Sequence, residues 1–332
     1  MIRRPDTVEA LRAGGKAALT RALTAVETET DQQALARFLD AAEGAARARV
    51  LGLTGPPGVG KSTLTNALIK AFRARGETVG VIAVDPSSQI TGGALLGDRT
   101  RLSTDPEDTG VFVRSMAARD RLGGLSDHAI AGVVLMRAVM DRVIVESVGI
   151  GQSEADVVHA VDTLALCIQP GSGDSLQFMK AGVMELPDLV AVTKADMGAL
   201  ARRARADVEG ALSLSRPAGA GPLPEVLLVS AASGEGLDAF VAACDTHLDA
   251  AEADGRCARR RRAQARHWVD DTITRRFGTV GRARCDVERA IAETSGPFAA
   301  IAALDADMRA RLAAGPRRAD GRAEDGGEVF RR

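Results

Sequence analysis

The sequence contains no tyrosine, and aromatic residues make up only 3% of its 332 positions. Platforms on which single-stranded nucleic-acid bases could stack are therefore scarce. A net charge of −1 gives no overall electrostatic reason to bind nucleic acid or an anionic membrane. No apolar run approaches the roughly 18 residues that a membrane span needs, and the first residues do not read as a secretory signal. We expect a cytoplasmic protein that binds neither nucleic acid nor membrane.

Cysteine is equally sparse. Cys167, Cys244, Cys257 and Cys285 are widely separated, and they form neither a Cys-x-x-Cys pair nor a Cys/His cluster. The spacing suggests no disulfide framework and no structural zinc site. We therefore expect reduced thiols.

The sequence does contain a change of hydrophobic period. Residues 7–47 have the spacing of two amphipathic helices. From Arg49 onward, short apolar runs alternate with amphipathic segments, as in an α/β fold whose mostly parallel sheet is covered on both faces. The predicted strands are Val50–Thr54, Val79–Asp85, Val111–Arg114, Arg142–Ser147, Thr163–Gln169, Leu189–Thr193 and Glu225–Ser230.

After about Leu248 the pattern is helical. It predicts a long helix over Ala250–Phe277, a second near Val287–Glu293 and a third near Pro297–Leu312, whereas residues 315–332 lack an apolar face and are expected to be disordered. The six arginines between Arg256 and Arg266 favour a solvated helix face over a nucleic-acid interface.

A phosphate-binding loop is indicated between the first predicted strand and the helical pattern that begins at Thr63. The residues Gly55-Pro56-Pro57-Gly58-Val59-Gly60-Lys61-Ser62 fit the spacing G-x-x-x-x-G-K-[ST]. Backbone N–H groups of such a loop and the following helix N-terminus face the phosphates. Lys61 would reach the β- and γ-phosphates, and the Ser62 hydroxyl would ligate Mg²⁺.

A base-binding site is indicated by Thr193-Lys194-Ala195-Asp196, which follows another apolar strand. A carboxylate at Asp196 can accept both N1–H and N2–H of guanine, a donor pair that adenine lacks, while the Lys194 stem covers the base. The residues Ser230, Ala231 and Ala232 end a further strand and would offer N–H groups to guanine O6. Taken alone, Asp196 would equally suit a helix cap, and residues 230–232 would equally suit a plain loop. Because both segments follow the phosphate loop along the chain, a GTP-binding site is favoured.

Acidic residues end two further predicted strands. Glu146 would hold a metal-bound water, and the amide of Gly149 would bond the γ-phosphate, so that loss of this phosphate releases the following loop. Asp85 ends a second strand. Two acids at neighbouring strand tips are costly without a cation, which favours a metal site over a solvated loop.

These motifs resemble the MeaB/ArgK family, GTPase chaperones of methylmalonyl-CoA mutase and related adenosylcobalamin mutases, once also described as transport ATPases. The resemblance covers roughly residues 7–310. Besides the phosphate loop, the residues that carry it are Asp85-Pro-Ser-Ser88, Gly92-Gly-Ala-Leu-Leu-Gly-Asp98-Arg-Thr-Arg-Leu102, Leu122-Gly-Gly124, Glu146-Ser-Val-Gly-Ile-Gly-Gln-Ser-Glu154 and Pro170-Gly-Ser-Gly-Asp174.

The resemblance implies an overall organisation and an activity. It implies a P-loop NTPase of the SIMIBI class over residues 48–249, a helical extension over 1–47, a helical dimerisation arm over 250–314 and a tail over 315–332. It also implies a homodimer with low intrinsic GTPase activity that protects an adenosylcobalamin-dependent acyl-CoA mutase and gates loading of its cofactor. Trp268, Val269, Ile273 and Phe277 would form the arm's apolar stripe, although they could equally be intramolecular core.

Site roles also follow from matching positions. Ser62, Asp85, Asp98 and Glu146 would form the magnesium shell, and Lys61, Asp98, Glu146 and Gly149 the catalytic set. The first, second and third switches would be Gly92–Leu102, Gly149–Glu154 and Gln169–Lys180, with Gln177 and Lys180 signalling to the mutase. Two positions depart from the family pattern: Thr193 stands where Asn is usual, and Asp120 where Gly is often found.

Two other functions compete with this interpretation. A metallochaperone GTPase for nickel-enzyme maturation would share the phosphate loop, but His128, His159, His247 and His267 are too scattered to supply its usual ligands. A transport-associated ATPase or kinase is opposed by Asp196.

Overall fold

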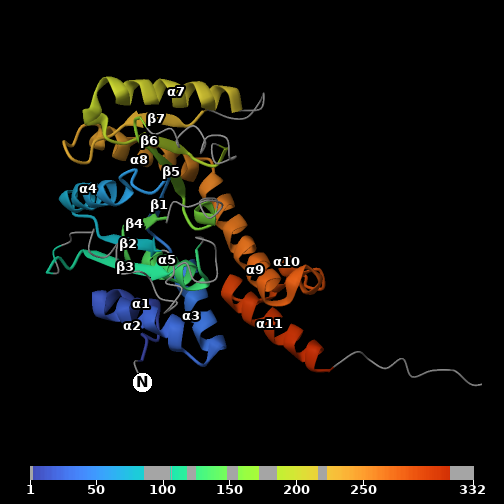
Figure 1. Cartoon of the computed structure of the whole chain (residues 1–332). Helices are drawn as coiled ribbons and strands as arrows, with labels where there is room; N and C mark the ends of the chain where they lie inside the picture. Colours follow the sequence, from blue (N-terminus) through green and yellow to red (C-terminus); the bar gives the residue numbers. More distant parts are fainter. Residues whose placement is uncertain are drawn as a thin grey trace, which may run out of the picture.

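The computed structural model describes residues 3–85, 105, 107–117, 125–147, 156–171, 185–215 and 223–314. A central sheet is flanked by helices, and a long helix near the C-terminus runs from the sheet toward the N-terminal helices (Figure 1).

The sheet has seven strands in the order β3-β2-β4-β1-β5-β6-β7, and every neighbouring pair is parallel. All seven predicted strands are present within three residues of their predicted ends. They are β1 (Arg49–Thr54), β2 (Val79–Asp85), β3 (Val111–Ala117), β4 (Arg142–Glu146), β5 (Thr163–Ile168), β6 (Leu189–Val192) and β7 (Glu225–Leu228).

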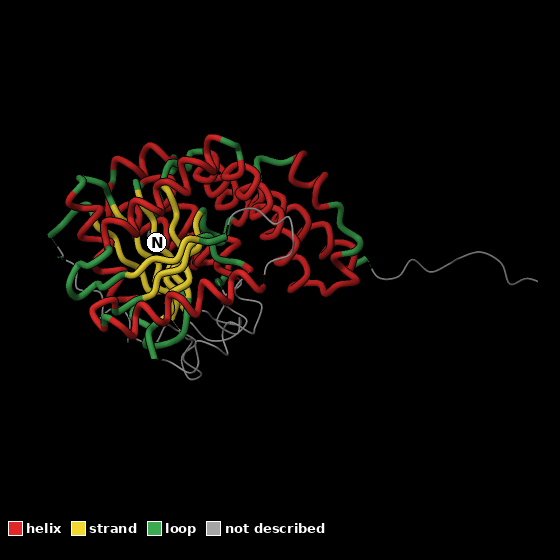
Figure 2. The backbone as a smooth tube through the Cα atoms, turned by 90° about the horizontal axis from the view of Figure 1, so that it is seen from above, coloured by secondary structure: helices red, strands yellow, loops and turns green. Residues whose placement is uncertain are grey.

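Helices cover both faces of the sheet (Figure 2). On one face, α4 (Lys61–Ala74) and α8 (Leu237–Ala253) close an apolar cluster with residues of β1, β2 and β5. On the other face lie α5 (Asp127–Val139), the 3-10 helix η2 (Asp156–His159) and α7 (Ala199–Ser215). The α/β class with a parallel sheet covered on both faces is confirmed.

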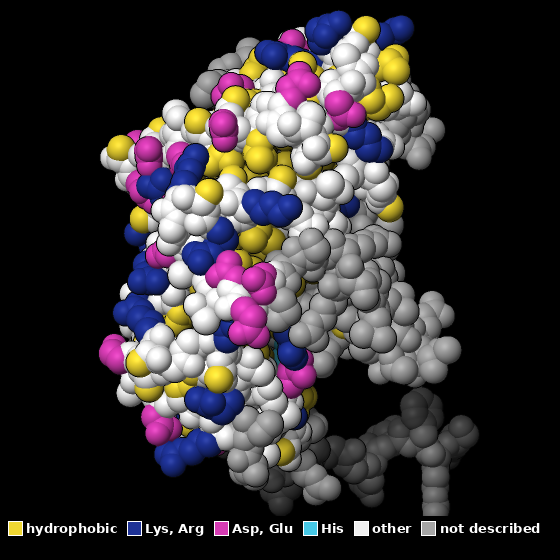
Figure 3. All heavy atoms as spheres, turned by 90° about the vertical axis from the view of Figure 1, so that its left-hand side faces the viewer, with side chains coloured by type: hydrophobic (Ala, Val, Ile, Leu, Met, Phe, Trp, Pro, Cys, Tyr) yellow, Lys and Arg dark blue, Asp and Glu magenta, His cyan; other side chains and the backbone are white. Residues whose placement is uncertain are grey.

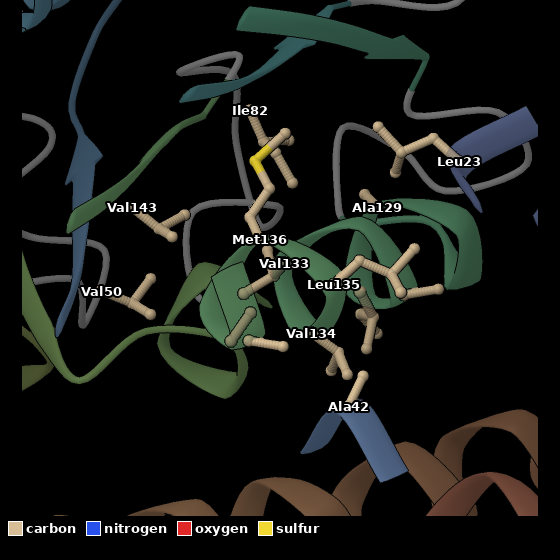
Figure 4. Close-up of a cluster of buried hydrophobic side chains, with 14 of the residues drawn as sticks. Leu23, Ala42, Val50, Ile82, Ala129, Val133, Val134, Leu135, Met136 and Val143 are labelled. Carbon is tan, nitrogen blue, oxygen red and sulfur yellow. The ribbon is translucent and has the colours of Figure 1, made fainter. Parts of the chain in front are cut away.

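Helix α5 is buried on all sides because it lies between the sheet and the N-terminal helices. In Figure 4, Met136 and Val133 of α5 lie toward the strand residues Val50, Ile82 and Val143. The other labelled side chains of α5, which are Ala129, Val134 and Leu135, extend toward Leu23 and Ala42 of the N-terminal helices. An amphipathic pattern is therefore absent from α5, as expected for a helix packed between two layers.

The N-terminal region forms three helices, where the periodicity predicts two. They are α1 (Val8–Ala13), α2 (Gly15–Thr28) and α3 (Gln32–Gly44). The extra boundary lies at Gly14 and Gly15, and Gly15 has a φ of +55° that breaks the helical path.

The C-terminal region also differs from its prediction, because no single helix runs from Ala250 to Phe277. Helix α8 ends at Ala253, and α9 (Arg256–Arg282) begins after Gly255, whose φ of +73° separates the two. Gly278 interrupts α9 with a φ of +70°. Helices α10 (Val287–Glu293) and α11 (Pro297–Ala313) follow, close to their predicted bounds, and α11 lies beside α3.

The apolar stripe of α9 is intramolecular core. Val269 and Ile273 are fully buried and Trp268 is 2% exposed; Val269 and Ile273 pack with residues of α10 and α11. The arginine-rich start of α9 is not entirely a solvated face: Arg260 pairs with Asp188, and Arg261 pairs with Asp162. The prediction of a solvated face is therefore wrong for these two arginines, because they attach α9 to the sheet domain.

The four cysteines are unpaired, as predicted, and all of them are buried. Burial raises the pKa of Cys167 and of Cys244 to about 12. On the face shown in Figure 3, basic and acidic side chains are interspersed rather than gathered by sign. Among the described helices, none combines the length and apolar character required to cross a membrane.

Candidate functional site

The phosphate loop joins β1 to α4 at the carboxyl edge of the sheet, and α4 begins at Lys61. Gly55 has a φ of +135°, and a Cβ there would lie 2.2 Å from the backbone oxygen of Cys167 on β5. Only glycine therefore permits the chain to leave β1 along this path. Gly60, with a φ of +104°, directly precedes the helix. Pro57, Gly58 and Thr63 are exposed along the loop and the helix start.

Lys61 lies against the loop that precedes it. Its ammonium donates to the backbone oxygen of Gly55 at 2.7 Å and to that of Pro56 at 3.1 Å, and the residue is 6% exposed. An ammonium group can donate three hydrogen bonds and rotate between acceptors. Lys61 is thus held at the phosphate loop with a positive charge that suits phosphate oxygens.

Glu146, at the end of β4, lies beside the first turn of α4. The Ser62 hydroxyl donates to Glu146 Oε1 at 2.6 Å, and the Thr65 hydroxyl donates to Oε2 at 3.0 Å. Glu146 is 4% exposed. Sequence reasoning missed Thr65, although its position three residues after Ser62 places both hydroxyls on one helix face. A hydroxyl and a carboxylate are the hard oxygen ligands that Mg²⁺ prefers, so Ser62 and Glu146 fit this ion.

The remaining predicted magnesium and switch residues are only partly described. Asp85 is the last residue of β2. Two residues before it, Ala83 is paired with Glu146 of β4. The side chain of Asp85 lies outside the described part. The further predicted residues outside the described ranges are Asp98, Gly149, Gln177 and Lys180. So are the first and second predicted switches and most of the third.

Thr193 connects the predicted base site to the phosphate loop. Its hydroxyl lies 2.7 Å from the backbone oxygen of Val59 and 3.1 Å from that of Ile168, and the residue is 5% exposed. Because both partners are backbone oxygens, the hydroxyl is the donor. The tether between loops that an Asn would provide is thus present here with Thr193.

Asp196 lies in a short 3-10 helix after β6, next to the loop that follows β7. The hydroxyl of Ser230 donates to Asp196 Oδ1 at 2.6 Å, and Asp196 is exposed. Ala231 and Ala232 continue the turn after Ser230. One carboxylate oxygen is therefore held by Ser230, and the residue remains exposed to solvent.

Lys194 adopts the left-handed conformation, with a φ of +55°, although it is not glycine. Its ammonium donates to Gln169 Oε1 at the end of β5 and lies 3.5 Å from the backbone oxygen of Gly58. The side chain therefore extends from the base loop over the phosphate loop. The sequence places Gln169 at the end of a predicted strand and at the start of the third switch, and its contact with Lys194 depends on the adjacency of β5 and β6.

The arrangement defines the class of the protein: its parallel sheet, phosphate loop and flanking helices are those of a P-loop GTPase fold. The chain is 28% identical to a solved LAO/AO transport system kinase, with a TM-score of 0.66 over 91% of this chain and 96% of that one.

The sequence model of the family described as methylmalonyl-CoA mutase-associated GTPase MeaB matches residues 19–282, and the chain belongs to this family. It is 46% identical over 193 residues to a putative GTPase of Pyrococcus horikoshii, covering 58% of this chain and 60% of that protein. The chain thus spans less than two thirds of this relative's length. A probable GTPase of Mycobacterium tuberculosis is 39% identical over 306 residues, covering 86% of this chain and 90% of that protein.

Proposed function

We propose that this protein binds guanine nucleotide with Mg²⁺ and hydrolyses GTP. The observation that carries the proposal is the contact of the Thr193 hydroxyl with Val59, which ties the loop bearing Asp196 to the phosphate loop. One ligand can then contact both loops, with its phosphates at Lys61 and its base at Asp196. The family membership of the chain supports the same activity.

The residues of the site have separate roles in this proposal. Lys61 neutralises charge on the β- and γ-phosphates, and backbone N–H groups of Gly58–Thr63 donate to phosphate oxygens. Ser62 and Glu146 hold Mg²⁺, which stabilises negative charge on the phosphates during cleavage. Asp85, Asp98 and Gly149 complete the metal shell and the γ-phosphate contact. Ser230 orients the Asp196 carboxylate toward the guanine edge, and the Lys194 stem covers the base.

Selectivity for guanine is tested by changing the hydrogen bonds at Asp196. Calorimetry with the Mg²⁺ complexes should show tighter binding of GTP than of ATP. In Asp196→Asn, GTP affinity should fall by about tenfold or more, since two bonds to a charged acceptor are altered. Xanthosine triphosphate, which has an oxygen in place of the guanine amino group, should bind this variant better than the parent, because an amide supplies the matching donor.

Asp207→Asn is the matched control, since Asp207 is an exposed aspartate on α7. It should leave all three affinities unchanged. Equal binding of GTP and ATP by the parent chain, or an unchanged preference in Asp196→Asn, would defeat the proposal.

We further propose that the GTPase serves as a chaperone of an adenosylcobalamin-dependent acyl-CoA mutase, protecting it and gating the loading of its cofactor, and that the chain acts as a homodimer in the cytoplasm. The description of the family as mutase-associated supports the partner. The residues after Asp85 and Glu146 would be ordered by the γ-phosphate, and Gln177 and Lys180 would pass this state to the mutase.

This part of the proposal is tested with purified methylmalonyl-CoA mutase. Single-turnover GTP cleavage is measured with and without the mutase, and complex formation by size exclusion is measured with GDP and with a non-hydrolysable GTP analogue. The mutase should change the cleavage rate, and the two nucleotides should give different amounts of complex. Absence of a complex with either nucleotide, together with an unchanged rate, would refute the mutase as partner.

A further inference from the structure

The chain segment that directly follows the predicted second switch rests on β1. Val157 of η2 and Val161 are both buried. A Cβ at Gly52 of β1 would lie 3.0 Å from a methyl carbon of each of these valines. Residues 156–162 therefore pack closely on the strand that leads into the phosphate loop.

Helix α9 holds this segment through its backbone oxygens. Gln264 Nε2 donates to the oxygen of Val158 at 3.0 Å and to that of Val161 at 2.7 Å. Trp268 Nε1 donates to the oxygen of His159 at 2.7 Å. The imidazoles of His159 and His267 stack with ring centroids 3.6 Å apart. We call residues 158–162 and their partners on α9 the η2 clamp.

An ion pair closes the η2 clamp. Arg261 donates to both carboxylate oxygens of Asp162, at 2.8 and 2.7 Å, and Arg260 donates to the backbone oxygen of the same residue. Arg261, Gln264 and Trp268 lie three and four positions apart, so they share one face of α9. The whole clamp is thus made by a single helix surface.

The buried amide of Gln264 has a specific role in this contact. It is 2% exposed, and a buried polar side chain costs free energy unless it is hydrogen-bonded. The oxygens at the end of a helix lack partners from the helix itself. Gln264 and Trp268 supply donors to two of them, those of Val158 and His159, and Gln264 also donates to the oxygen of Val161 just beyond the helix. The conformation of residues 158–161 is therefore linked to the position of α9.

The other half of α9 is joined to the remaining C-terminal helices. Val269 and Ile273 form an apolar cluster with Val287 of α10 and with Ala300 and Met308 of α11. A displacement of α9 at the η2 clamp would therefore be transmitted to α10 and α11.

We propose that α9 couples the nucleotide state to the C-terminal helices through the η2 clamp. This inference rests on the proposed function, because it requires that the chain binds both GDP and GTP. In the proposed function the γ-phosphate orders the chain after Glu146, and residues 156–162 continue that chain. By linkage, an α9 that favours one conformation of the segment also changes the relative affinity for the two nucleotides.

The decisive measurement is the ratio of the Kd values for GDP and for a non-hydrolysable GTP analogue, measured by calorimetry on the full chain. Gln264→Ala removes two of the donors and should change this ratio by about fivefold or more. Trp268→Phe removes one donor, retains an aromatic ring and should change the ratio in the same direction. This variant replaces Gln264→Ala in the test if Gln264→Ala does not fold. Arg262→Ala is the control, since Arg262 is exposed and lies about 200° around the helix from Gln264.

Intrinsic fluorescence gives a second readout, because Trp268 is the only tryptophan and the chain has no tyrosine. The emission of the parent chain should differ between its GDP and GTP-analogue complexes. A clamp with only a structural role would lower stability and leave the ratio of Kd values unchanged, so a change of less than twofold overturns the inference. Identical emission in the two complexes overturns it as well. If neither nucleotide binds, the proposed function itself fails.

Discussion

Gly55 and Gly58 of the phosphate loop both have left-handed backbone conformations, with φ of +135° and +75°, but their surroundings differ. A Cβ at position 55 would lie 2.2 Å from the backbone oxygen of Cys167. At position 58, no described atom lies within 4 Å of the added carbon. A steric effect can therefore be separated from the strain that both positions share.

Gly55→Ala is expected to lower the free energy of unfolding by about 3 kcal/mol or more, because overpacking against β5 adds to the strain of a positive φ. Gly58→Ala should cost about 1–2 kcal/mol from the strain alone. Urea denaturation of both variants measures the difference. Equal losses would show that Cys167 does not exclude a side chain at position 55.

Sequence reasoning reached the phosphate loop because its chemistry is local. The spacing of Gly55, Gly60, Lys61 and Ser62 is contained in eight consecutive residues. The partners of the phosphate loop are not all local. The hydroxyl of Thr193, which follows β6, contacts the backbone oxygen of Val59 in the loop and that of Ile168 at the end of β5. These partners follow from the order of the strands, which the residue pattern alone does not specify.

Among the helices, α11 begins on a carboxylate that belongs to α3. Asp40 accepts hydrogen bonds from the backbone N–H groups of Phe298 and Ala299 at 2.9 and 3.0 Å, and from the hydroxyl of Ser295 at 2.7 Å. Asp40 is 5% exposed. It thus acts as an N-terminal cap supplied by another helix, where the helix dipole favours negative charge.

Asp40→Ala is expected to lower the free energy of unfolding by about 1–3 kcal/mol, since buried donors at the start of α11 lose their acceptor. Asp40→Asn keeps one acceptor oxygen and should lose less. Urea denaturation measures both values. If the two variants are equally stable, the carboxylate does not contribute through these hydrogen bonds.

At the scale of the whole molecule, α9 is attached to the sheet domain by ion pairs, one of them with a buried carboxylate. The carboxylate of Asp162 is almost fully buried and pairs with Arg261 at 2.7 Å. Burial alone would raise the pKa of Asp162, but the hydrogen bonds and charge of Arg261 outweigh it and hold the pKa below its usual value. The unfolded chain therefore takes up a proton at this residue first as the pH falls.

The stabilising contribution of Asp162 should be fully present above about pH 4 and should be lost as the pH falls through the lowered pKa of the folded state. At neutral pH, Asp162→Asn is expected to cost about 3–5 kcal/mol, because Arg261 loses its carboxylate partner and keeps only the backbone oxygen of Ala48 as a strong acceptor. Urea denaturation should be measured from neutral pH to below about pH 4. The difference in free energy of unfolding between Asp162→Asn and the parent chain should decrease as the pH falls.

Asp307→Asn provides the control for this prediction. Asp307 pairs with Arg311 on the exposed surface of α11, and such pairs contribute about 1 kcal/mol or less. A loss in Asp162→Asn that is no larger than the loss in Asp307→Asn, or one that does not depend on pH, would contradict the assignment.

Hydrophobic periodicity and short motifs are sufficient to predict the class of fold, the seven strands and the phosphate loop. These features depend on periodicity and on residues close together in the chain, where backbone geometry sets which side chains share a face. The contacts of α9 with residues 158–162 and of Asp40 with α11 follow from the folded arrangement and not from the residue pattern. These partners lie more than 90 residues apart along the chain, and hydrophobic periodicity does not record which distant surfaces meet.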